Sequence, residues 1–238
     1  VTTAPPEPVV FSHDSRLLLA RHGDAGVIYD VARGEKLATL TGHTGPLASG
    51  MFRKDRERVV TTSSDKTARI WETRTGKLLR VIGDSTKPVN FAAFASEGDG
   101  ILVISEQRAE ILDTEPGRIL ALEGYAGRFG SARFSPDGTR VVTASDDGTA
   151  IVWDARSGKQ LAKLVGHSRG VLDAWFSPDG LRVLTYSDDT STRLWDSASG
   201  ANIAILAVVE GGGNVIGQFS RSGTQYFTAS EDRTTIPL

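Results

Sequence analysis

The chain has 238 residues, and its 27 basic and 29 acidic side chains leave a formal net charge of −2. This balance argues against the strongly basic surface of a nucleic-acid-binding protein. The chain has no cysteine, which excludes disulfides and thiolate chemistry. Its longest apolar run, residues 203–209, is far too short to span a bilayer. We therefore expect no nucleic-acid partner and no membrane insertion, and we place the protein in the cytoplasm.

Residues 1–8 carry three prolines and predict a lead-in rather than a strand, because proline cannot donate to a sheet. From residue 9 onward one order of segments recurs: three short β-rich runs, a turn that contains glycine, and a fourth run. Alternating and β-branched residues between turn signals are typical of strands, and no stretch has the period of a helix. The repeated units have approximate boundaries at 9–41, 42–83, 84–124, 125–166, 167–209 and 210–238, and the last unit is incomplete.

The fourth and fifth units share their motifs. Phe-Ser-Pro-Asp-Gly stands at 134–138 and again at 176–180, and the two Trp-Asp pairs, which begin at Trp153 and Trp195, lie 42 residues apart. A period of about 40–45 residues that ends on Trp-Asp is typical of a four-stranded propeller blade. The chain therefore predicts a single all-β propeller domain over 1–238, with five complete blades and a partial sixth.

In these motifs the chain resembles the WD40-repeat family from residue 9 onward. The resemblance implies a buried tetrad of His, Ser, Asp and Trp that holds each blade. Two repeats carry all four residues: His43, Ser63, Asp65 and Trp71 in the second, and His167, Ser187, Asp189 and Trp195 in the fifth. The fourth repeat has Ser145, Asp147 and Trp153, with Tyr125 at the histidine position. The first and third repeats lack the set.

The remaining sequence offers no chemistry that the repeats do not explain. A buried carboxylate needs hydrogen-bond donors, so the paired acids at 146–147 and 188–189 are expected to supply one tetrad acid each rather than a catalytic dyad. His13 and His22 have no partners at metal-ligand spacing. No nucleophile elbow, P-loop or dinucleotide fingerprint is present. We expect no catalytic residue, no metal and no cofactor.

What remains is a surface formed by loops. In a propeller the loops between second and third strands, and those between blades, share one face. The residues expected on this face are Ser64, Lys87, Glu106, Arg128, Asp146, Arg169, Asp188 and Glu231. Members of the family commonly bind peptides or proteins there, and the mixture of charges suits a polar peptide.

The sequence leaves two questions open. The sixth blade lacks its outer strand, so the chain is either a fragment of a larger, often seven-bladed propeller, which we favour, or a six-bladed ring closed by residues 1–4. A third route is closure by another chain, which would make an obligate oligomer. The expected function is a non-enzymatic scaffold that binds a protein, a peptide or other domains of its own polypeptide, and it suits the sensor or assembly domain of a larger signalling protein. The alternatives are an enzyme or small-molecule binder that uses the central channel, and a purely architectural domain.

Overall fold

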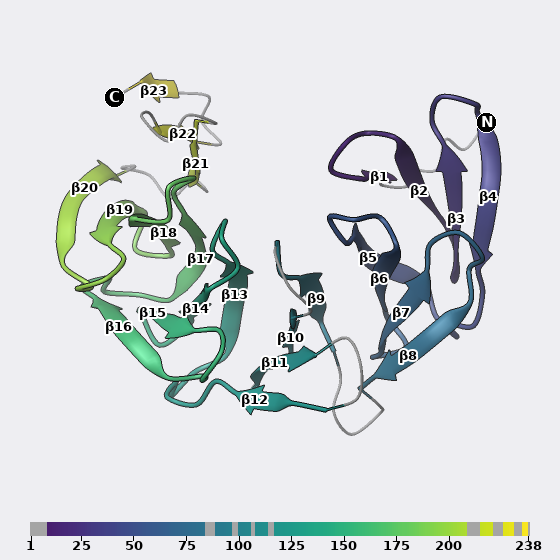
Figure 1. The fold of residues 1–238 in the computed structure, drawn as a ribbon. Helices are drawn as coiled ribbons and strands as arrows, with labels where there is room; N and C mark the ends of the chain where they lie inside the picture. Colours follow the sequence, from purple (N-terminus) through teal and green to yellow (C-terminus); the bar gives the residue numbers. More distant parts are fainter. Residues whose placement is uncertain are drawn as a thin grey trace. The chain divides into compact units, whose positions relative to one another are not determined.

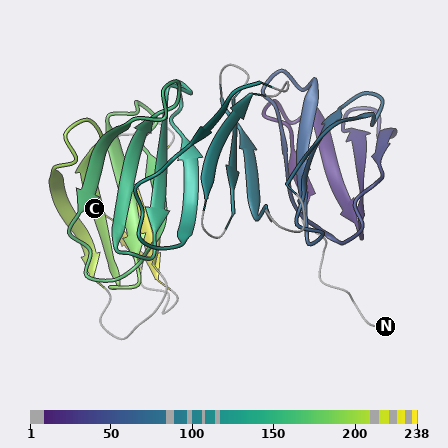
Figure 2. The same cartoon turned by 90° about the horizontal axis from the view of Figure 1, so that it is seen from below.

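The computed structural model describes residues 9–83, 89–96, 100–105, 108–113, 117–208, 215–220, 226–230 and 235–237. All regular structure in these residues is β-strand, in five four-stranded antiparallel sheets and one three-stranded sheet (Figures 1 and 2). Each sheet is a meander of consecutive strands. The predicted all-β propeller, with five complete blades and a partial sixth, is confirmed.

The strand bounds follow the predicted repeats. Blade 1 consists of β1 (Val9–Phe11), β2 (Leu17–His22), β3 (Ala25–Asp30) and β4 (Glu35–Leu40). Blade 2 consists of β5 (Leu47–Phe52), β6 (Arg58–Ser63), β7 (Ala68–Glu72) and β8 (Leu78–Ile82). Blade 3 consists of β9 (Phe91–Phe94), β10 (Gly100–Ile104), β11 (Ala109–Asp113) and β12 (Ile119–Ala121).

The later blades have the same order. Blade 4 consists of β13 (Phe129–Phe134), β14 (Arg140–Ser145), β15 (Thr149–Asp154) and β16 (Gln160–Val165). Blade 5 consists of β17 (Val171–Phe176), β18 (Arg182–Ser187), β19 (Ser191–Asp196) and β20 (Asn202–Val208). The partial blade 6 consists of β21 (Val215–Phe219), β22 (Tyr226–Ser230) and β23 (Thr235–Pro237).

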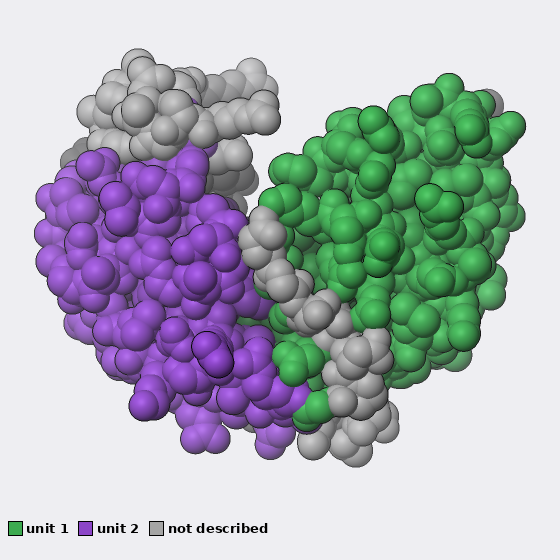
Figure 3. All heavy atoms as spheres, viewed as in Figure 1, with its two compact units in different colours: residues 1–106, 112–117 green, residues 107–111, 118–238 purple. Residues whose placement is uncertain are grey.

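The chain forms two compact units, and each is described by itself (Figure 3). Unit 1 contains residues 1–106 and 112–117, and unit 2 contains residues 107–111 and 118–238. Because the division passes through β11, blade 3 contributes to both units. The single domain over 1–238 stays a prediction.

The core of each unit lies between neighbouring sheets. In unit 2, Val142 and Val152 of blade 4 share one cluster with Val183 and Trp195 of blade 5. The second strand of a blade is buried on both faces. In β14, for example, all five residues 141–145 are buried. Burial on both faces explains why these strands read as short continuous apolar and threonine runs rather than as an alternation.

The inner strands of blades 4 and 5 approach each other closely at Gly130. A Cβ atom on this residue would stand 2.7 Å from the carbonyl oxygen of Leu172 and 2.9 Å from that of Val171. Both atoms belong to the backbone, so neither can rotate away. Glycine is therefore required here by the packing of β13 against β17.

We predict that Gly130→Ala lowers the free energy of unfolding by about 1–3 kcal/mol, the usual cost of overpacking. Gly117→Ala is the matched control, because its nearest neighbour would lie 3.9 Å from the new Cβ. Urea denaturation of both variants measures the difference. Equal stability of the two variants would contradict the close approach.

Candidate functional site

A chain of four hydrogen-bonding side chains crosses blade 2 and ends at its loop. The indole Nε1–H of Trp71 donates to Thr61 Oγ1 at 2.8 Å, and Thr61 Oγ1 lies 2.9 Å from His43 Nε2. His43 Nδ1 in turn lies 2.8 Å from Asp65 Oδ2. The indole N–H of Trp71 can only donate, so the Thr61 hydroxyl accepts from it and donates its own hydrogen bond to His43 Nε2. The Nδ1–H of the neutral His43 then donates to the Asp65 carboxylate.

Blade 5 repeats this arrangement. Trp195 Nε1 donates to Thr185 Oγ1 at 2.7 Å, and the same hydroxyl lies 2.7 Å from His167 Nε2. His167 Nδ1 lies 2.9 Å from Asp189 Oδ2. The carboxylate also accepts the backbone N–H groups of Ser168 and Ser191. The four groups therefore tie the second and third strands of the blade to the loop that enters its first strand.

The prediction that the serines belong to this hydrogen-bonded tetrad was wrong. In blade 2, the Ser63 hydroxyl donates to the carbonyl oxygen of Gly45 at 2.7 Å and accepts the backbone N–H of Asp65. Ser187 makes the equivalent contacts with Arg169 and Asp189 in blade 5. Side chains two residues apart on a strand share one face, but only the earlier one is level with the indole. The serines instead hold the loops to each other.

Blade 4 forms a different network with tyrosine. Trp153 Nε1 donates to Thr143 Oγ1 at 2.7 Å, as in the other two blades. The Tyr125 hydroxyl donates to the carbonyl oxygen of Thr143 at 2.7 Å and contacts the Thr143 hydroxyl. Asp147 bonds to Ala126 N and to Thr149, without a contact to the tyrosine. Ser145 is fully buried and accepts the backbone N–H of Asp147.

The repeats without tryptophan fill the same places with apolar side chains. The residue ten positions before each closing tryptophan is Thr61, Thr143 or Thr185, whereas Leu19 precedes Tyr29 by the same distance and Leu102 precedes Leu112. Leu19 and Leu102 are both fully buried. This ten-residue spacing is the signal in the sequence that could have identified the threonines.

Burial and hydrogen bonding fix the charge state of these groups. Burial lowers the pKa of His43 and of His167, although the neighbouring carboxylate opposes the effect. Burial disfavours the charged form of Asp65 and Asp189, but the hydrogen bonds that they accept outweigh it and hold the pKa of each well below its usual range. Burial raises the pKa of Tyr125 well above that of a solvated tyrosine. At neutral pH the histidines and the tyrosine are therefore uncharged and the carboxylates are ionised.

The structure brings four of the predicted face residues together in unit 2. Asp146 donates its backbone N–H to the carbonyl oxygen of Arg128 at 3.0 Å, and its Oδ1 accepts the Arg128 N–H at 2.6 Å. Asp188 N bonds to the carbonyl oxygen of Gly170 at 2.9 Å, next to Arg169. A Cβ on Gly170 would stand 3.1 Å from the Asp146 Cα, so the loops of blades 4 and 5 touch.

All four of these side chains are exposed. In unit 1, Ser64 is also exposed, and its backbone N–H bonds to the carbonyl oxygen of Pro46 at 3.0 Å. Lys87, Glu106 and Glu231 lie outside the described residues. We call Arg128, Asp146, Arg169 and Asp188 the loop face of unit 2.

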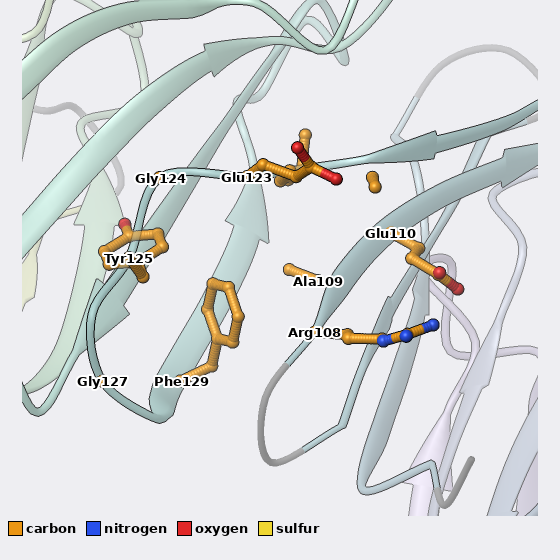
Figure 4. Close-up of a pocket in the computed structure, with 10 residues that line it drawn as sticks. Arg108, Ala109, Glu110, Glu123, Gly124, Tyr125, Gly127 and Phe129 are labelled. Atoms are coloured by element: carbon orange, nitrogen blue, oxygen red, sulfur yellow. The ribbon is translucent and has the colours of Figure 1, made fainter.

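A hollow of about 350 Å³ adjoins this loop face, and no motif in the sequence predicts it. It lies between β11, the end of β12 and the loop that leads into β13 (Figure 4). The Tyr125 and Phe129 rings meet edge to face, with centroids 4.8 Å apart, on one side of it. Three charged residues also line it, namely Arg108, Glu110 and Glu123.

The described residues offer no other obvious chemistry. They contain no group of three side chains that could hold a metal ion. No helix in the described part of the chain could cross a membrane.

Comparison with known proteins agrees with this geometry. The family model for the WD domain, G-beta repeat, matches residues 34–72, 118–154 and 158–196. The C-terminal WD40 domain of Sif2 superposes with a TM-score of 0.79 at 21% sequence identity, over 96% of this chain and 65% of that domain. The chain belongs to the WD40-repeat family. Its repeats include some that the family model does not match, such as most of blade 3, where Leu102 and Leu112 take the threonine and tryptophan positions.

Relatives of this WD40 chain occur in plants, animals and fungi. It is 31% identical to the guanine nucleotide-binding protein subunit beta of Oryza sativa subsp. japonica over 51% of its length and 35% of the relative's. It is 30% identical to pre-mRNA-processing factor 19 of Bos taurus over 65% of the chain and 32% of that protein. The chain thus spans about a third of the length of these relatives.

The shared hydroxyl of a WD40 tetrad can be tested directly. We predict that Thr185→Val lowers the free energy of unfolding by about 1–3 kcal/mol, because the buried Trp195 N–H and His167 Nε2 both lose their partner. Thr39→Val is the matched control, a threonine on β4 with no side-chain hydrogen bond in the described structure. Denaturant titration should separate the variants; equal stability would contradict the assigned role of Thr185.

Stability should also fall in two stages on acidification. Because the folded histidines have pKa values below the usual 6.5, the unfolded chain binds more protons than the folded chain below about this pH, and the free energy of unfolding falls as pH falls through it. Asp65 and Asp189, with pKa values below the usual 3.8, add a second loss below about pH 4.

Denaturation midpoints measured from neutral pH down to pH 3 test this dependence. The double variant H43Y/H167Y, which copies the tyrosine of blade 4, should reduce the first loss and leave the second in place. An unchanged slope between pH 6.5 and 5 in that variant would contradict the role of the two histidines.

Proposed function

We propose that this WD40 chain is a non-enzymatic scaffold that binds a protein or peptide on the loop face of its blades. The observation that carries the proposal is the mutual locking of the loops. Arg128, Asp146 and Gly170 are held by backbone contacts to one another, while the side chains of the face stay exposed. A rigid frame that displays variable polar side chains is suited to recognition.

The titratable groups support binding rather than catalysis. The described groups with displaced pKa values are either tetrad members and their blade 4 counterparts, or aspartates in turns, such as Asp137 and Asp179. These groups make hydrogen bonds within their own blades, except that Asp14 of blade 1 also accepts a hydrogen bond from Arg56 of blade 2. Catalytic groups with displaced pKa values instead converge on a shared cleft. The alternative of an enzyme or small-molecule binder that uses the central channel therefore receives no support from these groups.

The relatives point in the same direction. Two of them are named as subunits of larger assemblies: the guanine nucleotide-binding protein subunit beta, and the target of rapamycin complex subunit LST8 of Saccharomyces cerevisiae, 33% identical over 42% of the chain and 34% of its own length. A role as the sensor or assembly domain of a larger signalling protein is consistent with these names. Protein partners or other domains of the same polypeptide, rather than nucleic acid, are the proposed ligands.

Site-specific cross-linking tests the proposal. A photoreactive amino acid placed at Arg169 or Asp188 should give a discrete adduct in a cell extract, because these side chains are exposed on the loop face. The same group at Leu161 or Lys163, exposed on the outer strand β16, is the control and should not. Adducts that form equally from both sets of positions, or from neither, would count against the loop face.

A further inference from the structure

The lining of the hollow departs from the other repeats at three positions. Tyr125 stands where blades 2 and 5 have histidine. Glu123, two residues earlier, replaces Thr41 and Val165 of those blades, and Phe129 replaces Leu47 and Val171. Leu47 and Val171 are buried, whereas Phe129 is partly exposed. Three departures within the short segment 123–129 thus line one hollow.

The rings and charges lie on different sides of this hollow. Figure 4 shows Arg108 and Glu110 extending together on the β11 side, away from the rings of Tyr125 and Phe129. Glu123 is exposed, and its carboxylate has no hydrogen-bond or ion-pair partner among the described residues. The hollow thus has an unpaired carboxylate and two aromatic rings in its walls, and rings attract cations through their faces.

The charged side chains that line the hollow give it a negative balance. They are Arg108, Glu110 and Glu123, two carboxylates against one guanidinium group. A negative lining favours the approach of a positively charged segment.

We propose that the hollow receives a lysine or arginine side chain of a partner segment docked on the loop face of unit 2. Gly127 and Phe129 line the hollow while Arg128, between them, belongs to the loop face, so a segment that crosses this face passes the opening. The cationic head lies near the Glu123 carboxylate and the two rings, and the aliphatic stem contacts Leu122 and Ala109 at the walls. This inference rests on the proposed function, since it names the chemistry of the partner.

Small probes test the hollow without knowledge of the partner. The complete 238-residue chain, labelled with nitrogen-15, is titrated with N-acetyl-lysine methylamide, N-acetyl-arginine methylamide, and the norleucine analogue, which lacks the ammonium group. The cationic probes should shift the backbone amides of residues 108–110 and 121–129, and the norleucine probe should bind more weakly. Glu123→Gln should weaken the cationic probes about twofold to fivefold, the effect of one exposed charge pair.

Two variants complete the design. Phe129→Val, which introduces the residue that blade 5 has at this position, should also weaken the cationic probes. Glu35→Gln, an exposed glutamate on β4 in unit 1, is the charge-matched control and should leave them unchanged. Equal binding of the norleucine probe, tighter binding of N-acetyl-glutamate methylamide, or equal effects of the two Glu→Gln variants would overturn the inference.

The two proposals can fail separately. If the probes do not bind but loop-face cross-links form, the partner docks without a cation in the hollow and the proposed function stands. If the probes bind but position-specific cross-links are absent, the hollow is a cation site and the loop-face scaffold is wrong.

Discussion

The threonine hydroxyl shared by a tryptophan and a histidine is the interaction on which blades 2 and 5 depend. In blades 2 and 5 it accepts the indole N–H and donates to the imidazole, and the imidazole in turn binds a carboxylate at the loop. A single oxygen thus satisfies two buried groups that would otherwise be costly to bury. Because this chain runs from strand to loop, the stability of the sheet and the position of the loop are coupled.

The other blades replace this network in part or lack it. Blade 4 keeps the Trp153–Thr143 bond and replaces the histidine with Tyr125, which reaches the same threonine without involving Asp147. Blades 1 and 3 lose both the tryptophan and the threonine, and bury Leu19 and Leu102 instead. A partly satisfied buried network is less stable than an apolar core, which explains why the tryptophan and the threonine are both absent from blades 1 and 3.

The same substitutions that alter the network shape the candidate site. Tyr125 is a member of the blade 4 network through its hydroxyl, and its ring contacts Phe129 in the wall of the hollow. The hollow therefore lies where blade 4 meets blade 3, in which the tetrad is absent. The loop face of unit 2 adjoins it and carries charges of both signs. The proposed binding of a partner therefore takes place beside blades 3 and 4, where Glu123, Tyr125 and Phe129 differ from the residues of blades 2 and 5.

The sequence by itself determined the architecture. The period of 41–42 residues, the Gly-containing turns and the short β-rich runs predict four-stranded blades. Each period holds four runs of residues that favour strands, and turn signals separate the runs. Its resemblance to the WD40-repeat family further implied the histidine, aspartate and tryptophan of the tetrads and the loop face, whose predicted residues are exposed where the structure describes them.

Only the tertiary structure decided which hydroxyl joins the tryptophan to the histidine. Ser63 and Thr61 lie on the same strand face, and the motif spacing does not tell which one is level with the indole. The hollow likewise depends on how Glu123, Tyr125 and Phe129 meet residues 108–110 across two blades. Repeat motifs describe the interior of one blade, whereas a cavity between blades arises from packing between segments that no single repeat contains.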